Sequence, residues 1–337
     1  MQLNEITLTP ILESLQLLKI SDAEYFSPKY GSYVSNSRLG LINPKQGGSP
    51  EAFFEGFKDE GFNPSFMLGS AVHELCLQPE YFELAPALGK PTAKLGAMAD
   101  ELYPIWLKHP IKVSDITKAS DKINYYKGKL TKEIIKKVNM QCKPYWEHRK
   151  SAQLNSTKEI IYLDDKSRDT VFSCAEALTC NQQVQSLLHP EDLLEDPISL
   201  NEHAILLDIQ AKCPNGKEFT IHLKAKLDNF TIVGNTITVN DIKTIGKVVS
   251  EIDNNIVRYH YSRELSFYLF LLRLYVAKEY KIENPVMNAN YLVVSTIPQY
   301  YTKVRVMNAQ ECAQGIHEFK TLLRYVAYQI GYNGYSL

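Results

Sequence analysis

Alternating apolar and polar residues predict a β-hairpin in the second half of the chain. Residues 198–211 (ISLNEHAILLDIQA) and 218–230 (EFTIHLKAKLDNF) both follow the two-residue period of a strand. The Pro-Asn-Gly sequence at 214–216 lies between them and is typical of a tight turn. Further strands are expected at 235–244, 290–296 and 302–308.

Longer-period patterns predict helices around these strands. Ser49 and Pro50 form the N-cap and first position of a short helix. Residues 1–30 show no clear period and are expected to be irregular. Longer helices are expected at about 65–78, 173–188, 257–280 and 309–330. The order of elements predicts an α/β (α+β) fold in which helices flank one central mixed sheet of about five strands.

Composition narrows the class of protein. The chain has 337 residues, 45% of them hydrophobic and 22% charged, which fits one large globular domain or two ordinary ones. We expect a single domain over residues 1–337. No apolar run approaches the ~18 residues of a membrane span, and the N-terminus has no basic leader, so we expect a cytoplasmic protein without a membrane partner. Its six cysteines form no CxxC pair, which argues against a zinc ribbon, an iron–sulfur site or a disulfide scaffold.

One segment is strongly basic although the whole chain has a formal charge of -1. Residues 90–150 contain 14 Lys and Arg against 6 Asp and Glu, with Tyr and Trp residues interleaved. We interpret residues 85–150 as a basic helical insertion. Such an asymmetry can mark the contact with a polyanion, and the alternative is a solvated lysine-rich surface.

Candidate chemistry lies in the predicted strands. Asp228 ends one strand, and Asp241 and Lys243 share a face of the next because alternate strand residues point the same way. Two carboxylates brought together ionise jointly only with a cation between them, and oxygen ligands suit Mg²⁺ or Mn²⁺. A nearby lysine could orient the attacking water and stabilise negative charge on a phosphoryl group. Taken alone, the pattern is a weak signal, because Asp and Lys at strand ends are usually solvated.

Several further segments change that interpretation. Residues 69–82 (GSAVHELCLQPEYF) contain His73, and KAKLD at 224–228 is followed by Asp-Ile-Lys at 241–243. Tyr261, Glu264 and Tyr268 have the spacing Tyr-x-x-Glu-x-x-x-Tyr, which places them on one face of a helix. In these motifs, and in YVSNSRLGLINP and SPEAFF upstream, the sequence resembles the RecB/RecE-type PD-(D/E)XK nucleases, which include exodeoxyribonuclease VIII and phage exonucleases.

The resemblance implies a restriction-endonuclease-like core and a metal-dependent deoxyribonuclease. It implies that His73, Asp228, Asp241 and the Ile242 carbonyl hold one or two Mg²⁺ (or Mn²⁺) ions, and that Lys243 is the catalytic lysine. It further implies 5′-to-3′ hydrolysis of duplex DNA ends in phage-type recombination, with a single-strand annealing protein as partner and a homo-oligomeric, often ring-shaped assembly in a bacterial or phage-infected cell.

Two residues depart from the family pattern. Leu227 stands where many members have proline. This change is tolerated because the neighbouring carboxylate, not the proline, holds the metal. Glu264 replaces the usual glutamine, and an acid there is unfavourable beside phosphates unless it is protonated or paired.

Three residues are candidates for contact with DNA: Arg38, Glu264 and Tyr268. Arg38 could grip a terminal 5′ phosphate, since a guanidinium pairs bidentately with phosphate oxygens, or it could be an ordinary surface arginine. Tyr268 could instead belong to the core of its helix. Glu202, on the strand before KAKLD, is expected at a solvated edge.

Other functions remain open at this point. Within the same fold, the chain could be an endonuclease or a repair nuclease of different polarity. It could also be a non-catalytic DNA-binding module, although such a copy should have lost some of His73, Asp228, Asp241 and Lys243, and all four are present. A structural or host-interaction protein would require the motif series to be coincidental.

Overall fold

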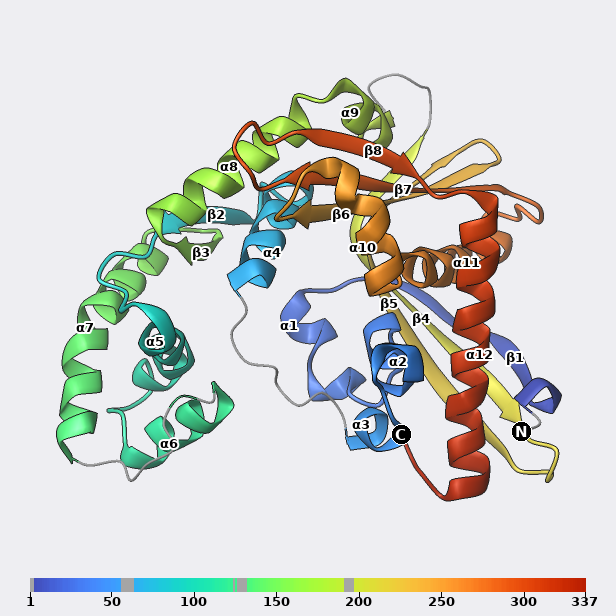
Figure 1. Cartoon of the computed structure of the whole chain (residues 1–337), viewed down its shortest axis with the longest axis horizontal. Coiled ribbons are helices and arrows are strands. Elements are labelled where there is room, and N and C mark those ends of the chain that lie inside the picture. Colours follow the sequence, from blue (N-terminus) through green and yellow to red (C-terminus); the bar gives the residue numbers. More distant parts are fainter. Residues whose placement is uncertain (1–2, 56–63, 124, 126–131, 191–196) are drawn as a thin grey trace. The chain divides into compact units, whose positions relative to one another are not determined.

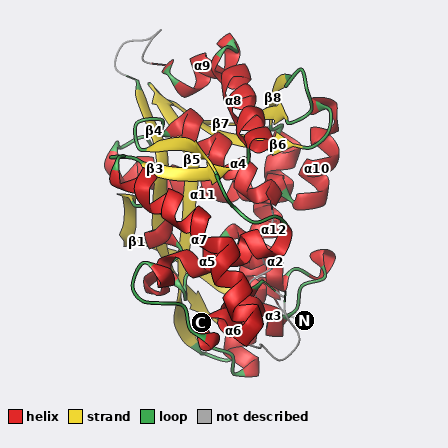
Figure 2. Ribbon diagram, turned by 90° about the vertical axis from the view of Figure 1, so that its left-hand side faces the viewer, coloured by secondary structure: helices red, strands yellow, loops and turns green. Residues whose placement is uncertain are grey.

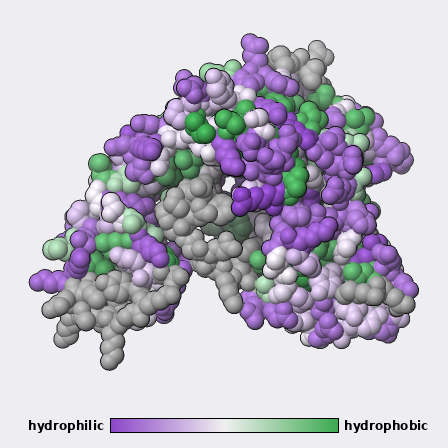
Figure 3. Space-filling model, viewed as in Figure 1, coloured by the Kyte–Doolittle hydropathy of each residue, from purple (hydrophilic) through white to green (hydrophobic). Residues whose placement is uncertain are grey.

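The computed structural model describes residues 3–55, 64–123, 125, 132–190 and 197–337 (Figure 1). It divides into two compact units, one made of residues 1–57 and 176–337 and the other of residues 58–175. Within the described residues, no helix combines the length and the apolar character needed to cross a membrane. Hydrophilic residues cover most of the face seen in Figure 3.

The first unit is built on a six-stranded sheet (Figures 1 and 2). In spatial order its strands are β1 (Thr7–Lys19), β4 (Ile198–Lys212), β5 (Glu218–Val233), β6 (Thr236–Ile245), β7 (Val286–Ser295) and β8 (Thr302–Val306). Neighbouring strands are antiparallel except β6 and β7, which are parallel. The predicted α/β class with a central mixed sheet is therefore confirmed.

The hairpin of β4 and β5 follows the predicted alternation. Its strands keep one register from Ile198 opposite Ile232 to Lys212 opposite Glu218, with the pairing interrupted at Glu202 and Asp228. Gly216 in the connecting turn has φ +84°, a left-handed conformation that favours glycine. All five strands expected from the pattern are present.

The sixth strand, β1, lies where residues 1–30 were expected to be irregular. It is an edge strand that pairs with β4, and its register shifts between Ile11 and Gln16. Leu15 is the only buried residue of β1, so the strand has no regular apolar face from which the sequence could predict it. Pro10 is tolerated because an edge strand has one unpaired side. The expectation for this segment was wrong, and the sheet has six strands where about five were expected.

Helices of the first unit pack on this sheet (Figure 1). They are α1 (Asp22–Tyr25), α2 (Asn36–Ile42), α3 (Pro50–Glu55), α9 (Gln182–Leu188), α10 (Ile252–Tyr259), α11 (Tyr261–Glu279) and α12 (Ala309–Asn333), with short 3-10 turns at Leu3–Glu5, Pro28–Tyr30, Pro44–Gln46 and Val249–Glu251. Ser49 caps α3 as predicted, accepting a hydrogen bond from the Ala52 amide at 3.2 Å. Gly315 lets α12 approach α11 closely, because a Cβ there would lie 2.3 Å from the Ser262 carbonyl oxygen.

Two expected helices are each divided in the structure. The segment expected at 257–280 breaks at His260, whose φ is +56°, so that α10 and α11 are separate. The segment expected at 173–188 breaks before α9, where Asn181 caps the new helix by accepting from the amides of Gln183 and Val184. A helical period continues through both breaks, which explains why the pattern alone joined them.

The second unit contains the basic segment. Its two parallel strands are β2 (Phe82–Pro86) and β3 (Glu159–Leu163), and its helices are α4 (Pro64–Leu77), α5 (Ala93–Trp106), α6 (Val113–Lys122), α7 (Lys132–Leu154) and most of α8 (Asp165–Thr179). Trp146 is buried and donates to the Ala99 carbonyl oxygen at 2.8 Å. Asp100 accepts from Tyr145 and Arg149 and pairs with Lys90 at 2.7 Å. The predicted insertion at 85–150 falls within this larger unit, and its status as an insertion stays a prediction.

Candidate active site

Strands β5 and β6 bring Asp228 and Asp241 together. Asn229 lies opposite Asn240 in their antiparallel register, so the adjacent Asp228 and Asp241 also face each other. The Oδ2 atom of Asp228 accepts a hydrogen bond from the Ile242 amide at 2.8 Å. Asp241 is only 2% exposed. Burial raises the pKa of Asp241, Lys243 opposes that effect, and Asp228 raises the pKa further.

Lys243 lies at the centre of the site's charges. Its Nζ atom is 2.8 Å from Asp241 Oδ2 and 3.0 Å from Glu264 Oε2, and it lies 4.5 Å from the centre of the Tyr261 ring. Burial lowers the pKa of Lys243, but the surrounding carboxylates raise it by more, so the net shift is upward and the side chain stays an ammonium. The predicted convergence of two carboxylates and a lysine is present in the structure.

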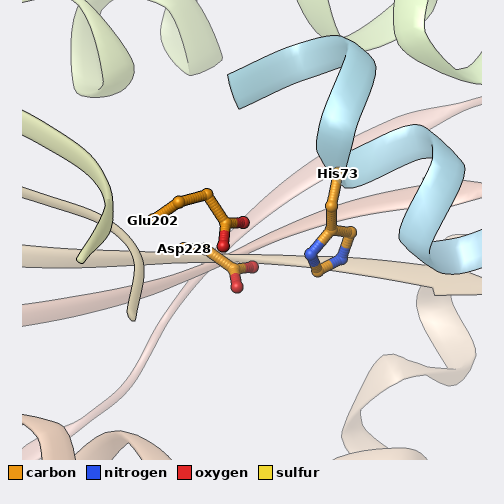
Figure 4. A group of neighbouring side chains, drawn as sticks. All are labelled: His73, Glu202 and Asp228. Carbon is orange, nitrogen blue, oxygen red and sulfur yellow. The ribbon is translucent and has the colours of Figure 1, made fainter. Parts of the chain in front are cut away.

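Glu202 joins this group, contrary to the sequence-based expectation. It is 7% exposed and pairs with Lys226 at 2.7 Å, so it is not at a solvated edge. Its φ of +54° is unusual for a residue other than glycine. In the β4–β5 register it lies opposite Asp228, and one carboxylate oxygen of each lies within 4.8 Å of the other. Figure 4 shows the two carboxylates side by side.

The position of Glu202 could have been read from the sequence. Because β4 and β5 pair symmetrically about the 214–216 turn, residues equally far from Asn215 lie opposite each other. Glu202 and Asp228 are both 13 residues from Asn215 by their numbers. The predicted turn therefore predicts that Glu202 lies opposite Asp228. This signal is missed when Glu202 is considered without its partner strand.

One face of α11 completes the site in this unit. Tyr261, Glu264 and Tyr268 lie on it, and the Tyr268 hydroxyl donates to Glu264 Oε1 at 3.3 Å. Tyr268 is 9% exposed, and burial and the neighbouring carboxylates raise its pKa, so it remains a neutral donor. An acid at position 264 was expected to be protonated or paired, and Glu264 is paired with Lys243. Its contact with DNA stays a prediction.

Three other predicted residues have defined places in the fold. Arg38 on α2 is 8% exposed, donates to the Gly31 carbonyl oxygen at 2.9 Å and lies over the Phe53 ring. Its Nε atom is buried and has no hydrogen-bond partner among the residues that the structure describes. His73 is half-buried on α4 of the second unit and is drawn in Figure 4. The roles of His73, Arg38 and the Ile242 carbonyl stay predictions.

The donor set of the first unit fits a hard divalent cation. Asp228, Asp241 and Glu264 carry three formal negative charges around the single ammonium of Lys243. The charge of Glu202 is matched locally by Lys226. Oxygen ligands with a net negative charge are those that Mg²⁺ and Mn²⁺ prefer. A cation here would also offset the burial, and the smaller repulsion from Asp228 and Glu264, that raise the pKa of Asp241.

Lys224 is a second buried cation on β5. It is 7% exposed, donates to the Tyr25 carbonyl oxygen at 2.8 Å and lies 4.5 Å from the Tyr25 ring centre. Burial, with a smaller contribution from Arg38, lowers the pKa of Lys224 to about 8. A buried ammonium with one hydrogen-bond acceptor is costly for the folded state.

We therefore expect Lys224→Met to raise the free energy of unfolding at neutral pH by at least about 1 kcal/mol. Between about pH 8 and the ordinary lysine pKa of 10.5, the unfolded chain holds a proton that the folded chain has lost, so the wild type gains stability as pH rises. The advantage of the variant should shrink over that window in urea unfolding at several pH values. The exposed Lys45→Met is the control, and a pH-independent difference for Lys224→Met would contradict the prediction.

Comparisons with known proteins give distant likenesses. No family model matches the chain, and no curated protein matches it either. Among solved structures it is similar to a protein from Eubacterium rectale named "Putative exonuclease", with a TM-score of 0.47 and 10% identity, covering 95% of this chain and 89% of that one. It is also similar to protein VC1899 from Vibrio cholerae, with a TM-score of 0.15 and 12% identity, covering 80% of this chain and 57% of that one. Neither likeness bears on the function of this chain.

Proposed function

We propose that this protein is a metal-dependent DNA nuclease of the RecE-like PD-(D/E)XK type, acting as an exonuclease on duplex ends. The observation that supports this most is the placement of Lys243 against Asp241, with Asp228 facing Asp241 from the next strand. A surface cluster of Asp and Lys would be solvated, but Asp241 is 2% exposed. Burying these charges lowers the stability of the folded chain. Proteins retain such groups mainly at functional sites.

Asp228 and Asp241 are the proposed ligands of one or two Mg²⁺ or Mn²⁺ ions, together with the Ile242 carbonyl and His73. Glu202 is added to this set because its carboxylate lies beside that of Asp228. His73 is assigned from its motif and would supply a nitrogen ligand. A bound divalent cation supplies Lewis-acid stabilisation of negative charge on phosphoryl oxygens.

The protein side chains have distinct parts in the proposed hydrolysis. Lys243 donates hydrogen bonds from its ammonium and orients the attacking water while it stabilises charge that develops on the phosphate. Glu264 holds the Lys243 ammonium, and Tyr268 holds Glu264. Water adds to phosphorus and the ester P–O bond breaks, with a proton passing to the leaving oxygen. A lysine fixed by two carboxylates is already oriented before substrate binds.

Substrate choice is a further part of the proposal. Arg38 is proposed to bind a terminal phosphate through its guanidinium, which would favour 5′-to-3′ digestion. A single-strand annealing partner and a homo-oligomer are proposed from the family resemblance alone. The alternative functions are an endonuclease on the same core and a non-catalytic DNA-binding module.

Degradation of end-labelled duplex DNA tests the proposed activity. Linear duplex labelled at the 5′ or the 3′ end, and a closed circle, would each be incubated with Mg²⁺ or with EDTA. Release of 5′-labelled mononucleotides only with Mg²⁺ supports the exonuclease and its direction. Nicking of the circle supports the endonuclease instead, and binding without cleavage supports the DNA-binding module.

The second unit offers a separate surface for the DNA backbone. A surface hollow of about 530 Å³ is lined by apolar residues and by Lys108, His109, Asn139 and Lys143. Trp106 also lines the hollow, and the Lys150 ammonium lies 5.9 Å from the centre of its ring. Lysines beside an aromatic ring suit the phosphates and bases of single-stranded DNA. We propose that this hollow contacts DNA, as expected for the basic segment.

Removing one lysine from this hollow should lower the affinity for DNA and reduce the dependence of that affinity on salt concentration. Lys108→Gln is expected to lower affinity a few-fold and to reduce the slope of log affinity against log salt concentration by about one. Lys166→Gln, an exposed lysine on α8, loses the same charge elsewhere in the unit and is the matched control. Equal slopes for the two variants in fluorescence-anisotropy titrations would show that the hollow makes no phosphate contact.

A further inference from the structure

We propose that a ladder of four asparagine side chains positions the active-site carboxylates. The asparagine ladder consists of Asn201, Asn229, Asn240 and Asn290, one each on β4, β5, β6 and β7. This inference rests on the proposed function, because it concerns how the strands hold the metal-binding groups. None of these asparagines touches the reacting atoms, so they are positioning residues.

Each amide of the ladder donates to the next strand in one direction. Asn290 Nδ2 donates to Asn240 Oδ1 at 2.9 Å, Asn240 Nδ2 to Asn229 Oδ1 at 2.8 Å, and Asn229 Nδ2 to Asn201 Oδ1 at 2.7 Å. The ladder therefore crosses four adjacent strands of the sheet through side chains alone. It adds cross-strand bonds to those of the backbone at the level of the site.

Three of the four ladder residues are buried, and both amide hydrogens of the two central ones form hydrogen bonds. Asn229 and Asn240 are 0% exposed, and Asn290 is 4% exposed. The second Nδ2 hydrogen of Asn240 goes to the Leu187 carbonyl oxygen at 3.0 Å, and that of Asn229 goes to Ser199 Oγ at 3.1 Å. Buried polar networks of this kind are stabilising only when every member is satisfied. Loss of one member leaves its neighbours buried and unpaired, which destabilises the arrangement of the strands.

Three ladder residues each have an active-site carboxylate as their direct neighbour in sequence. Asn201 precedes Glu202, Asn229 follows Asp228, and Asn240 precedes Asp241. Consecutive side chains on a strand leave opposite faces of the sheet. Asn229 and Asn240 thus lie behind Asp228 and Asp241, on the other face of β5 and β6.

In this position the asparagine ladder fixes the register of the strands that carry the carboxylates. A slip of one residue between strands would move each carboxylate to the wrong face and leave buried amides unpaired. An apolar contact would tolerate small shifts between strands, because it has no fixed direction. Directional amide bonds between Asn229 and Asn240 fix the register of β5 and β6 directly beside Asp228 and Asp241.

Metal binding without DNA tests this positioning role. We expect Asn240→Leu to weaken Mn²⁺ binding about tenfold in isothermal titration with MnCl₂ alone. Val294→Ala is the matched control, since Val294 is 0% exposed on β7 and lies outside the ladder and the site. It should lose stability while keeping the wild-type Mn²⁺ affinity, which separates positioning from general destabilisation.

A milder variant covers the case in which Asn240→Leu does not fold. Asn290→Leu removes only the terminal bond of the ladder, and a smaller loss of Mn²⁺ affinity is expected. Wild-type affinity in folded Asn240→Leu or Asn290→Leu would overturn the positioning role and leave the proposed nuclease intact. Absence of Mn²⁺ binding in the wild type would instead overturn the proposed metal site, and the inference with it.

Discussion

Asp241→Asn is expected to lower Mg²⁺-dependent cleavage by at least about 10³-fold, because it removes a charged ligand worth several kcal/mol of transition-state stabilisation. Asparagine keeps the shape of aspartate but lacks its charge. The Lys243 ammonium would still have Glu264 as a partner, so the site should keep its packing. The loss should therefore appear in cleavage rate and Mn²⁺ binding rather than in folding.

Stability provides a second readout for the same variant. Burial raises the pKa of Asp241, which means that its ionised form is unfavourable in the folded chain without a cation. The free energy of unfolding of Asp241→Asn should thus equal or exceed that of the wild type in EDTA. Asp208→Asn removes the same charge from a pair with His222 on the sheet and is the control for cleavage. Cleavage by Asp241→Asn at the rate of Asp208→Asn would contradict the metal-ligand assignment.

Arg263→Met is expected to lower the free energy of unfolding by about 3 kcal/mol, since it breaks a buried ion pair on one side. Arg263 is 2% exposed on α11 and pairs with Glu318 of α12 at 3.0 Å. Its Nε donates to Asn36 Oδ1 on α2 at 2.8 Å, and Nη1 donates to Gln46 at 3.0 Å. One guanidinium thereby joins three segments that support the site.

Urea unfolding measures this effect. Arg273→Met changes an exposed arginine on the same helix and should alter the free energy of unfolding by less than about 0.5 kcal/mol. Near-equal midpoints for the two variants would show that the Arg263 network contributes little to stability. A fall in cleavage of Arg263→Met that tracks its unfolded fraction would separate this structural role from the chemistry of Lys243.

The hairpin and the placement of its charged residues could be predicted because the relevant interactions are local. The turn at 214–216 fixes the β4–β5 register, and the alternation of KAKLD places its aspartate on a defined face. Asp241 and Lys243 then share a face because they are two residues apart on a strand. The pairing of Glu264 with Lys243 joins residues 21 apart, and its sequence signal was only the helical spacing of the Tyr-x-x-Glu-x-x-x-Tyr motif.

Other features depend on contacts that no local pattern records. β1 is formed by pairing with β4, almost 200 residues away in sequence, and its own apolar period is weak. The left-handed residue His260 divides α10 from α11 although the helical period continues through it. The asparagine ladder is likewise visible only after four strands are aligned, because each asparagine alone is an ordinary polar residue.

The most direct test of the central claim compares the wild type with Lys243→Ala on linear duplex DNA in Mg²⁺. The account predicts that the variant loses cleavage by at least about 10²-fold while it still binds Mn²⁺, because the ammonium supports the reaction and the carboxylates hold the cation. Cleavage of the DNA by Lys243→Ala at the wild-type rate would contradict it.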